Sequence, residues 1–485
     1  MGTEKSGGGS VRLSILTQEG VVAIHQASLE ILEGTGVVVD SPTALQILGD
    51  SGAIIEGEKV RIPAFLVEDA LESAPAQITI FDRAGEPSLL LGGDRCYFES
   101  AVALKMILDP FTRSRRRFVS EDYRMTTSVI DACPNISSAV AGGSEDVPLE
   151  VRPQVGFKNS VINMKKPLTC GGYDAQDLAD QFEVAAVVAG SYERLRQAPS
   201  IIAIALPVSP LCLYDDQTGK LLLAAQEGIP VAWYPALSAG TTAPCTPAGM
   251  LALANAEVLA GLVLHQLRRP GAPFIYGAMP GMTDMRSMLY SYGSPDMALY
   301  LAAATDIARF YGLPMYSTGG CSDAHSPDQQ AVAEATIMCM LGKLSGASVI
   351  HDLGMLGACE FISPEMIVLC DEVIGMIDHA TTRIDTGPED LALDLIREVG
   401  PGGHYLSSEH TLVNFRRLWY GEIFLREPVT GPGADRPDAV RERINERTRH
   451  IIETHRVAPL PEAVIGDLDE LETKWRARAG LREGG

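Results

Sequence analysis

The sequence lacks the short motifs that mark nucleotide and metal sites. No GxGxxG or GxxxxGK[ST] follows an apolar run, which argues against a nucleotide held at a helix N-terminus. No HExxH occurs, and none of the nine cysteines forms a CxxC pair. The spaced ligand pairs that are typical of zinc sites are therefore missing, and we expect no tightly bound metal.

Positive charge and long hydrophobic runs are also scarce. The chain has 39 Lys and Arg against 62 Asp and Glu, a net charge of −23, which argues against nucleic acid or anionic membranes as partners. The longest apolar runs, such as 258–267, are too short to span a bilayer. Residues 1–10 are rich in Gly and Ser and contain no apolar signal core. With an odd number of cysteines, most of them in apolar runs, we expect reduced thiols in a cytoplasmic protein.

What the chain has in quantity is apolar sequence: 46% of its 485 residues are hydrophobic. From about residue 120, β-branched runs that end at Gly or at polar residues alternate with helical stretches. The expected strands are 136–143, 167–173, 201–210, 230–240, 273–279, 314–320, 348–354 and, as an eighth, 404–406. The expected helices are 177–189, 218–226, 247–268, 295–311, 328–344 and 364–380. Strands spaced by about 30 to 45 residues are typical of parallel βα units.

Seven or eight such units favour an α/β protein built as a (βα)8 TIM barrel over an open doubly wound sheet. The strands are continuously rather than alternately apolar, as in a sheet that is buried on both faces. We expect an N-terminal α/β extension of a helix and short strands over 1–120. The catalytic barrel then covers 121–430 and a C-terminal helical tail covers 431–485.

One segment places three reactive side chains at the end of an expected strand. The run 314–320 stops at two glycines and is followed at once by Cys321, Ser322 and Asp323. In a parallel barrel, such positions face the active site. Cys321 could be a nucleophile, a metal ligand or a passive lining residue. We favour passive lining, because spaced metal-ligand partners are absent and the sequence does not place a base such as His351 beside the thiol.

The other strand ends supply aromatic residues and carboxylates. Although aromatics make up only 6% of the chain, they recur at these positions. Aromatic faces with one or two carboxylates are the physical solution for a quaternary ammonium ion, which cannot donate N–H hydrogen bonds. We predict a cation pocket walled by Trp233, Tyr234 and Tyr276, although any one of these rings could instead fill the core. The remaining predicted substrate-binding residues are Tyr173, Tyr316, Cys321, Ser322, Asp323 and Glu360.

Histidine is the other candidate for chemistry at the mouth. His351 and Asp352 end an expected strand, and we predict that they are catalytic residues in contact with the bound substrate. A structural role for such a histidine is the alternative. His404 and His410 are weaker candidates for the same work.

Five segments give the chain a family resemblance: 207–211 (PVSPL), 255–261 (NAEVLAG), 292–295 (YGSP), 311–324 (YGLPMYSTGGCSDA) and 354–356 (GML). Together they resemble the trimethylamine–corrinoid methyltransferase family over most of the chain. The resemblance implies a TIM barrel whose mouth receives a separate corrinoid protein. The cobalt(I) of that protein accepts a methyl group from the amine nitrogen.

The resemblance also bears on the substrate, because Cys321 occupies the position of pyrrolysine in the best-known members. Pyrrolysine is thought to activate a tertiary methylamine through an electrophilic imine, which cysteine cannot offer. Members without pyrrolysine resemble demethylases of quaternary amines, so we expect glycine betaine as the substrate. Proline betaine, carnitine or γ-butyrobetaine are alternatives within this class. A non-catalytic betaine-binding barrel and a metal-dependent hydrolase are alternatives outside it. We also expect a homo-oligomer.

Overall fold

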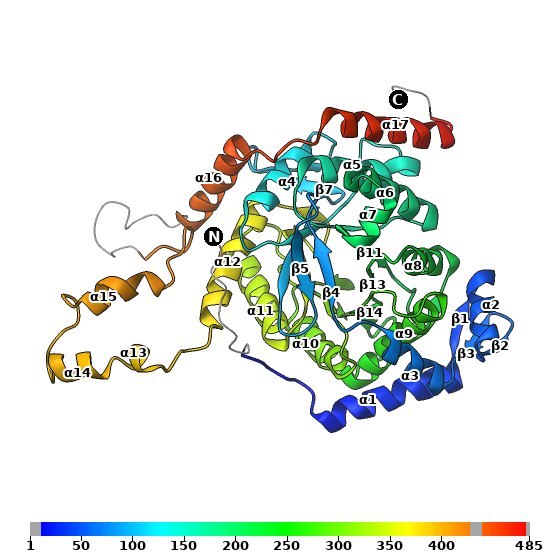
Figure 1. The fold of residues 1–485 in the computed structure, drawn as a ribbon, viewed down its shortest axis with the longest axis horizontal. Coiled ribbons are helices and arrows are strands. Elements are labelled where there is room, and N and C mark those ends of the chain that lie inside the picture. Colours follow the sequence, from blue (N-terminus) through cyan, green and yellow to red (C-terminus); the bar gives the residue numbers. More distant parts are fainter. Residues whose placement is uncertain (1–10, 427–438, 482–485) are drawn as a thin grey trace.

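The computed structural model describes residues 11–426 and 439–481, and its centre is a closed barrel of eight parallel strands (Figure 1). In chain order these strands are β6 (Tyr97–Ala101), β9 (Ser138–Val140), β10 (Leu168–Cys170), β11 (Ile201–Ala205), β13 (Val231–Trp233), β15 (Phe274–Gly277), β18 (Met315–Thr318) and β19 (Val349–Leu353). Strand β19 pairs with β6 and closes the sheet. The prediction of a (βα)8 barrel is confirmed.

Helices follow the strands and cover the outside of the sheet. They are α4 (Asp122–Ala132), α5 (Arg152–Asn163), α6 (Ala175–Ala189), α7 (Tyr192–Gln197), α8 (Asp215–Glu227), α9 (Pro247–Arg268), α10 (Pro295–Phe310), α11 (Gln329–Ser345) and α12 (Pro364–Ala380). Side-chain caps fix several of their starts: Ser294 caps α10, Asp328 caps α11 and Ser363 caps α12. Helix α9 is apolar and long enough to cross a membrane, but most of it is buried against the barrel.

The first strand of the barrel is β6, and this corrects two sequence predictions. Residues 404–406 form no strand; they lie exposed, far along the chain from the sheet. The barrel therefore begins before residue 121, inside the predicted N-terminal extension. In the sequence, Tyr97–Ala101 has the pattern of an extension strand because no helical stretch follows it until α4. The predicted boundary at 430/431 lies outside the described residues.

The N-terminal residues support the barrel from its side and its base. Helix α1 (Gln18–Glu30) packs against α9, as does α3 (Ala64–Ser73). The hairpin of β4 (Ile78–Phe81) and β5 (Pro87–Leu91) lies across the barrel in Figure 1. Its backbone bonds Pro199 O and Lys165 O, which precede barrel strands. The hairpin therefore covers the end of the barrel where the strands begin.

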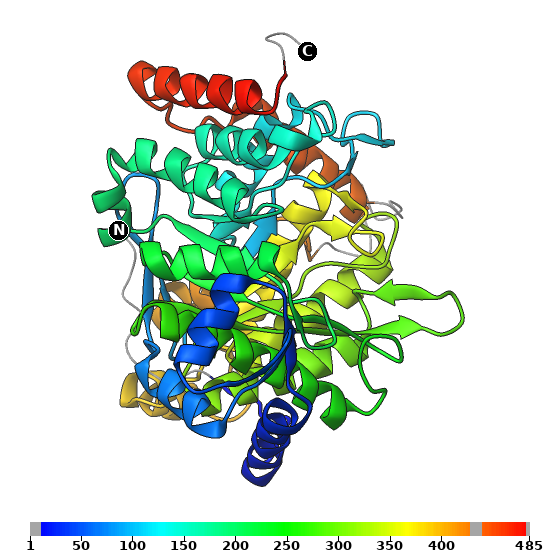
Figure 2. The ribbon, with the colours of Figure 1, turned by 90° about the vertical axis from the view of Figure 1, so that its right-hand side faces the viewer.

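Two small sheets extend the opposite end, where the strands finish. One contains β14 (Ala236–Ala239), β16 (Met279–Asp284) and β17 (Leu289–Ser291), and its hairpin projects from the body on the right of Figure 2. The other contains β20 (Met355–Leu356), β21 (Phe361–Ile362), β7 (Met106–Leu108) and β8 (Arg115–Arg117). Both sheets continue directly from barrel strands, so they form the rim of the mouth.

After α12 the chain leaves the body as an arm, which we define as residues 382–426. It carries α13 (Pro388–Leu391), α14 (Leu393–Val399) and α15 (Glu409–Asn414), which lie away from the barrel in Figure 1. The chain returns as α16 (Ala439–Thr454), packed on α12 and α4, and ends with α17 (Glu462–Arg478) on α5 and α6.

Candidate active site

Three rings from three strands meet inside the mouth. The His351 ring stacks on the Tyr316 ring with centroids 4.3 Å apart and planes 18° apart. The Tyr234 ring lies 5.6 Å from Tyr316 and 5.5 Å from His351. All three side chains are buried. The predicted residues Tyr234, Tyr316 and His351 are thus brought together into one aromatic cluster.

Below this cluster lies a carboxylate that is not among the residues predicted from the sequence. Glu99 of β6 is fully buried and accepts hydrogen bonds from the Tyr316 hydroxyl and, at 2.7 Å, from Thr169 Oγ1. Burial raises the pKa of Glu99, and the hydrogen bonds from Tyr316 and Thr169 oppose that rise. A glutamate within an apolar strand is the only signal that the sequence offered for it.

His351 is held at both ring nitrogens. Its Nδ1 lies 2.8 Å from Asp352 Oδ1, and its Nε2 lies 3.2 Å from Thr318 Oγ1. If Nδ1–H donates to the carboxylate, Nε2 of the neutral ring accepts from the threonine hydroxyl. The ring therefore has one fixed orientation against Tyr316.

The backbone of Asp352 is strained. Its φ is +79°, in the left-handed region that non-glycine residues rarely adopt, and the pairing of β19 with β6 shifts register here. Such a conformation costs roughly 1–3 kcal/mol and is commonly retained at functional sites. The irregularity turns the Asp352 carboxylate toward its own neighbour, His351.

Two further tyrosines from the rim sheet stand over the mouth. Tyr290 and Tyr292 make an edge contact with ring centroids 5.2 Å apart, and the Tyr290 hydroxyl donates to Met279 O at 3.3 Å. Gly281 has no side chain because a Cβ there would collide with the Tyr290 ring. Burial is the main cause of a raised pKa for both Tyr290 and Tyr292, and the nearby Asp352 charge adds to it. Neither tyrosine was selected from the sequence, although Tyr292 stands in one of the family motifs.

Cys321 is buried under this rim. Its Sγ lies 3.7 Å from Tyr292 O, and burial, reinforced by the Asp352 charge, raises the pKa of the thiol well above its usual range. Such a thiol is not ionised at neutral pH, which removes the form that acts as a nucleophile. The structure therefore favours a lining role.

Ser322 and Asp323 fix the loop that carries Cys321. Ser322 Oγ donates to Glu334 Oε2 at 2.5 Å, and the backbone N–H of Asp323 donates to the same oxygen at 2.9 Å. The Asp323 carboxylate accepts from Ser291 and, at 2.8 Å, from the N–H of Tyr292. Asp323 thus ties the tyrosine rim to the strand end, and its role is structural support for the site.

Two residues that were predicted to form pocket walls point to the outer face of the sheet instead of the interior. The Trp233 indole donates to Glu257 O on α9 at 3.0 Å, and the Tyr276 hydroxyl donates to Asn255 Oδ1, also on α9. Trp233 and Tyr276 are register partners on adjacent strands, so their side chains share the outer face of the sheet. The next residue, Tyr234, faces the interior because strand side chains alternate. The prediction of Trp233 and Tyr276 as walls is wrong.

The other predicted residues lie at the periphery. Tyr173 is 54% exposed on the loop after β10, and Glu360 is exposed beside the rim sheet. His404 and His410 are exposed on the arm, so they take no part in the aromatic cluster.

The family motifs meet one another behind the site. Glu257 accepts from Ser209 Oγ and from the N–H of Leu211, both at 2.7 Å, and so holds the loop after β11. Burial raises the pKa of Glu257 to about 7. The backbone N–H of Ser322 donates to Met355 O and joins two further motifs. The motifs thus build the frame that carries the rings.

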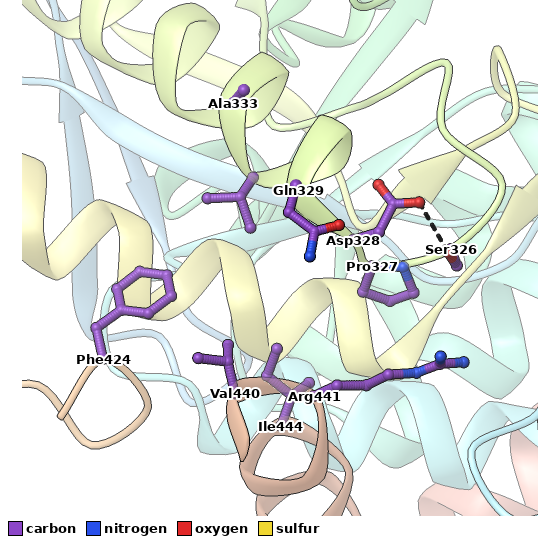
Figure 3. Close-up of a pocket in the computed structure, with 10 residues that line it drawn as sticks. Ser326, Pro327, Asp328, Gln329, Ala333, Phe424, Val440, Arg441 and Ile444 are labelled. Carbon is purple, nitrogen blue, oxygen red and sulfur yellow. Dashed lines mark hydrogen bonds between the residues drawn. The ribbon is translucent and has the colours of Figure 1, made fainter. Parts of the chain in front are cut away.

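The structure also contains a cavity of about 460 Å³ between α11 and α16 (Figure 3). It is lined by Ser326, Pro327, Asp328, Gln329, Val332, Ala333, Phe424, Val440, Arg441 and Ile444. None of the predicted site residues lines it. Among the described residues, no three His, Cys, Asp or Glu side chains are grouped to hold a metal ion.

The fold resembles a solved methyltransferase. The monomethylamine methyltransferase of Methanosarcina barkeri matches with a TM-score of 0.52 and 10% identity, covering 96% of this chain and 88% of that one. At that identity the likeness concerns the fold alone.

Sequence comparisons identify the family. The glycine betaine methyltransferase of Desulfitobacterium hafniense (strain Y51) is 31% identical over 476 residues, 98% of each chain. The trimethylamine methyltransferase MttB of Desulfitobacterium hafniense (strain DSM 10664 / DCB-2) is also 31% identical, over 87% of this chain and 85% of its own. The family model for trimethylamine methyltransferase (MTTB) matches residues 7–479. The chain belongs to the trimethylamine methyltransferase family.

Proposed function

We propose that this methyltransferase moves a methyl group from a quaternary amine, with glycine betaine as the preferred substrate, to the cobalt(I) of a corrinoid held by a separate protein. The observation that carries this proposal is the cluster of Tyr234, Tyr316 and His351 with the carboxylates of Glu99 and Asp352 beside it. Aromatic faces attract a quaternary ammonium without needing hydrogen bonds from it. The similarity to a glycine betaine methyltransferase over nearly the whole chain supports the same substrate.

The site needs little chemistry of its own for this transfer. A quaternary ammonium already carries its positive charge, and its leaving group is a neutral tertiary amine that requires no proton. The cobalt(I) of the partner is the nucleophile and becomes methylated. The chain's own residues then bind the cation, align one methyl group and exclude water, which together can lower the barrier by several kcal/mol.

The corrinoid protein needs a surface on the mouth side. The hairpin of β16 and β17 projects there and leaves Met285, Met288 and Leu289 58 to 65% exposed at its tip (Figure 2). Methionine-rich surfaces adapt their shape to a partner. We assign this tip to contact with the corrinoid protein.

One assay tests the reaction and its alternatives. The protein is incubated with cob(I)alamin and, in turn, glycine betaine, proline betaine, carnitine, γ-butyrobetaine and trimethylamine, and methylcobalamin absorbance is followed. We expect turnover with glycine betaine and none with trimethylamine. Turnover of another betaine alone would change the substrate, and binding of glycine betaine with no turnover of any amine would show a non-catalytic binding protein.

Replacing Cys321 separates passive lining from covalent catalysis. We expect Cys321→Ala and Cys321→Ser to keep glycine betaine demethylation within about tenfold of the wild type, about 1.4 kcal/mol of transition-state energy, because the buried thiol is protonated. A loss of several orders of magnitude, with a methylated thiol detected by mass spectrometry, would establish Cys321 as a methyl carrier instead.

We propose that the protein works in the cytoplasm, in keeping with its nine free cysteines.

We also propose that the protein is a homo-oligomer held together by the arm. The arm helices α13, α14 and α15 contain no buried residue. Twelve large apolar side chains of the arm are 39 to 89% exposed: Ile384, Leu391, Leu393, Ile396, Tyr405, Leu406, Leu412, Val413, Phe415, Leu418, Tyr420 and Leu425. The number of these exposed apolar side chains is comparable with the number of residues in the apolar part of a standard protein interface. A corrinoid protein leaves after each transfer and would expose them again, so a second copy of this chain is the better cover.

Charged substitutions on the arm should therefore dissociate the oligomer. We expect the double variant Leu406→Asp and Leu412→Asp to run as a monomer in light scattering at concentrations where the wild type is oligomeric. These residues are 85% and 70% exposed, so their replacement should not unfold the barrel. The matched control is Val22→Asp, 40% exposed on α1 and outside the arm, which should leave the oligomer intact. A monomeric wild type, or an unchanged oligomer in the arm variant, would contradict the proposal.

A further inference from the structure

Glu99 projects into the interior of the barrel. Its strand, β6, lies between β19 and β9. The side chain reaches past both neighbours, to Thr169 on β10 in one direction and to Tyr316 on β18 in the other. A side chain that contacts both of these strands must cross the interior, so Glu99 lies on the same face of the sheet as the aromatic cluster.

Glu99 is a buried charge without a basic partner. It is 0% exposed, and within residues 11–426 and 439–481 no Lys or Arg side chain forms an ion pair with it. Both of its oxygens accept hydrogen bonds, which is the pattern of an ionised carboxylate, since a protonated acid donates from one oxygen. Burying a carboxylate is costly unless an opposite charge compensates it.

The other charges of the cluster supply little of that compensation. A positive charge on His351 would favour the ionised form of Glu99, but the His351 Nδ1 already lies 2.8 Å from the buried carboxylate of Asp352. Burial raises the pKa of Tyr290 and of Tyr292, so both phenols are neutral at neutral pH. The cluster thus contains two carboxylates and one histidine, and negative charge predominates in it.

The Tyr316 ring connects Glu99 with the place where a cation would lie. Its hydroxyl donates to Glu99, while the ring stacks on His351 and lies 5.6 Å from the Tyr234 ring. A hydrogen bond from a phenol to a carboxylate increases the negative charge on the phenol, which strengthens the attraction of the ring for a cation. Cation–π attraction acts within about 6 Å of a ring centroid. Over such short distances in a low-dielectric interior, the charge of Glu99 also attracts the cation directly.

We propose that Glu99 is the counter-charge for the ammonium group of the substrate and acts through the Tyr316 ring to select cations over neutral molecules. The inference rests on the proposed function, because it assigns the negative charge of the same site. Glu99 takes no part in the transfer of the methyl group. It determines which molecules the rings bind.

Methyl transfer removes the charge that Glu99 attracts. The C–N bond breaks and its electron pair stays on nitrogen, while the methyl group bonds to cobalt through two electrons of cobalt(I), which is formally oxidised to cobalt(III). The ammonium group thereby becomes a neutral tertiary amine. Because the positive charge on nitrogen is largest in the bound substrate, Glu99 stabilises the substrate at least as much as the transition state. Such an interaction lowers KM without raising kcat, and it weakens the hold on the product.

The test replaces Glu99 with glutamine and compares two ligands that differ in charge. Glutamine keeps the size of the side chain and one acceptor oxygen, and in 3,3-dimethylbutyrate a carbon atom takes the place of the nitrogen of glycine betaine. In calorimetric titrations of the full-length protein, we expect Glu99→Gln to lose about tenfold or more in affinity for glycine betaine and to lose none for 3,3-dimethylbutyrate. Steady-state kinetics with cob(I)alamin should show a raised KM for glycine betaine and a kcat no lower than that of the wild type.

The matched control is Glu257→Gln. Glu257 is also 0% exposed and accepts two hydrogen bonds, but it belongs to α9 on the outside of the sheet. Its replacement should lower the melting temperature and leave the ratio of the two affinities unchanged. If Glu99→Gln does not fold, Glu99→Asp and Glu99→Asn make the same comparison, because they differ from each other in charge and hardly in shape. The aspartate variant should bind glycine betaine more tightly than the asparagine variant, with no difference for 3,3-dimethylbutyrate.

Three results would overturn the assignment of Glu99. Equal loss for both ligands would show that Glu99 only supports the Tyr316 side chain, and unchanged affinity for glycine betaine would show that it does not act on the cation. A reduced kcat at unchanged KM would place its effect in the transfer step instead. Each of these results leaves the proposed function intact if the wild type demethylates glycine betaine. A wild type that neither binds nor demethylates any betaine would overturn both.

Discussion

Replacing Tyr234 with alanine should weaken glycine betaine binding about thirtyfold. The ring is buried and lies 5.5 to 5.6 Å from two other rings of the cluster. A desolvated cation–π contact is worth about 2 kcal/mol, which corresponds to that loss in affinity. Tyr234→Phe keeps the aromatic face and should remain within about threefold of the wild type. Calorimetric titration of glycine betaine measures each affinity.

The chain offers a matched control for this experiment. Tyr276→Phe alters a buried tyrosine that hydrogen-bonds Asn255 behind the sheet, so it should change the melting temperature but not the affinity. In 3,3-dimethylbutyrate a carbon atom replaces the ammonium nitrogen of glycine betaine, so this analogue keeps the carboxylate but carries no positive charge, and its weak binding should be insensitive to Tyr234→Ala. Wild-type betaine affinity in a folded Tyr234→Ala protein would place the cation elsewhere.

The fold was predictable because βα units repeat a simple pattern. Apolar runs that end at Gly, each followed by a helical stretch, marked seven of the eight strands, and the helices 247–268 and 364–380 agree with α9 and α12 end for end. The first strand, β6, could not be assigned to the barrel from the sequence because its βα unit is irregular. The strands β7 and β8 lie between β6 and its helix α4. A repeat count could not assign a strand whose helix is delayed by an inserted hairpin.

The site was only partly predictable, and the reason is side-chain alternation. A strand end shows which residues are near the mouth but not which face of the sheet they occupy. Trp233 and Tyr234 are neighbours, yet one contacts α9 and the other contacts Tyr316. Register between strands, which decides the face, comes from pairing that a single sequence does not show.

Residues from insertions were missed for a different reason. Tyr290 and Tyr292 lie on a hairpin between β15 and α10, far from any barrel strand in sequence. They reach the mouth because β16 pairs with β14 and carries the hairpin over it. Only the tertiary pairing of strands places them there. The sequence shows Tyr292 shortly before the helix that starts at Ser294-Pro295, but it does not show that this tyrosine reaches the mouth.

Replacing His351 with alanine should lower turnover about a hundredfold with little change in substrate affinity. The ring is fixed by Asp352 at 2.8 Å and by Thr318 at 3.2 Å, and it stacks on Tyr316. Without it, Tyr316 loses a neighbour and the substrate methyl is no longer held in line with the incoming cobalt(I). A misplacement of about 1 Å can cost a rate factor of about 100. Steady-state kinetics with the protein-bound corrinoid separates kcat from KM.

A graded series distinguishes positioning from simple structural support. Asp352→Asn keeps a hydrogen-bond acceptor for His351, and asparagine tolerates the left-handed φ of +79°, so this variant should lose less activity than His351→Ala. Thr318→Val removes the partner of Nε2 and should also fall between the wild type and His351→Ala in kcat, at unchanged KM. Unchanged kcat for His351→Ala with free cob(I)alamin and with the corrinoid protein would remove His351 from the mechanism. We expect kcat to fall at unchanged KM because the alignment of the methyl group, and not the capture of the cation, depends on the orientation of the ring. A raised KM at unchanged kcat would contradict this and make His351 a binding residue.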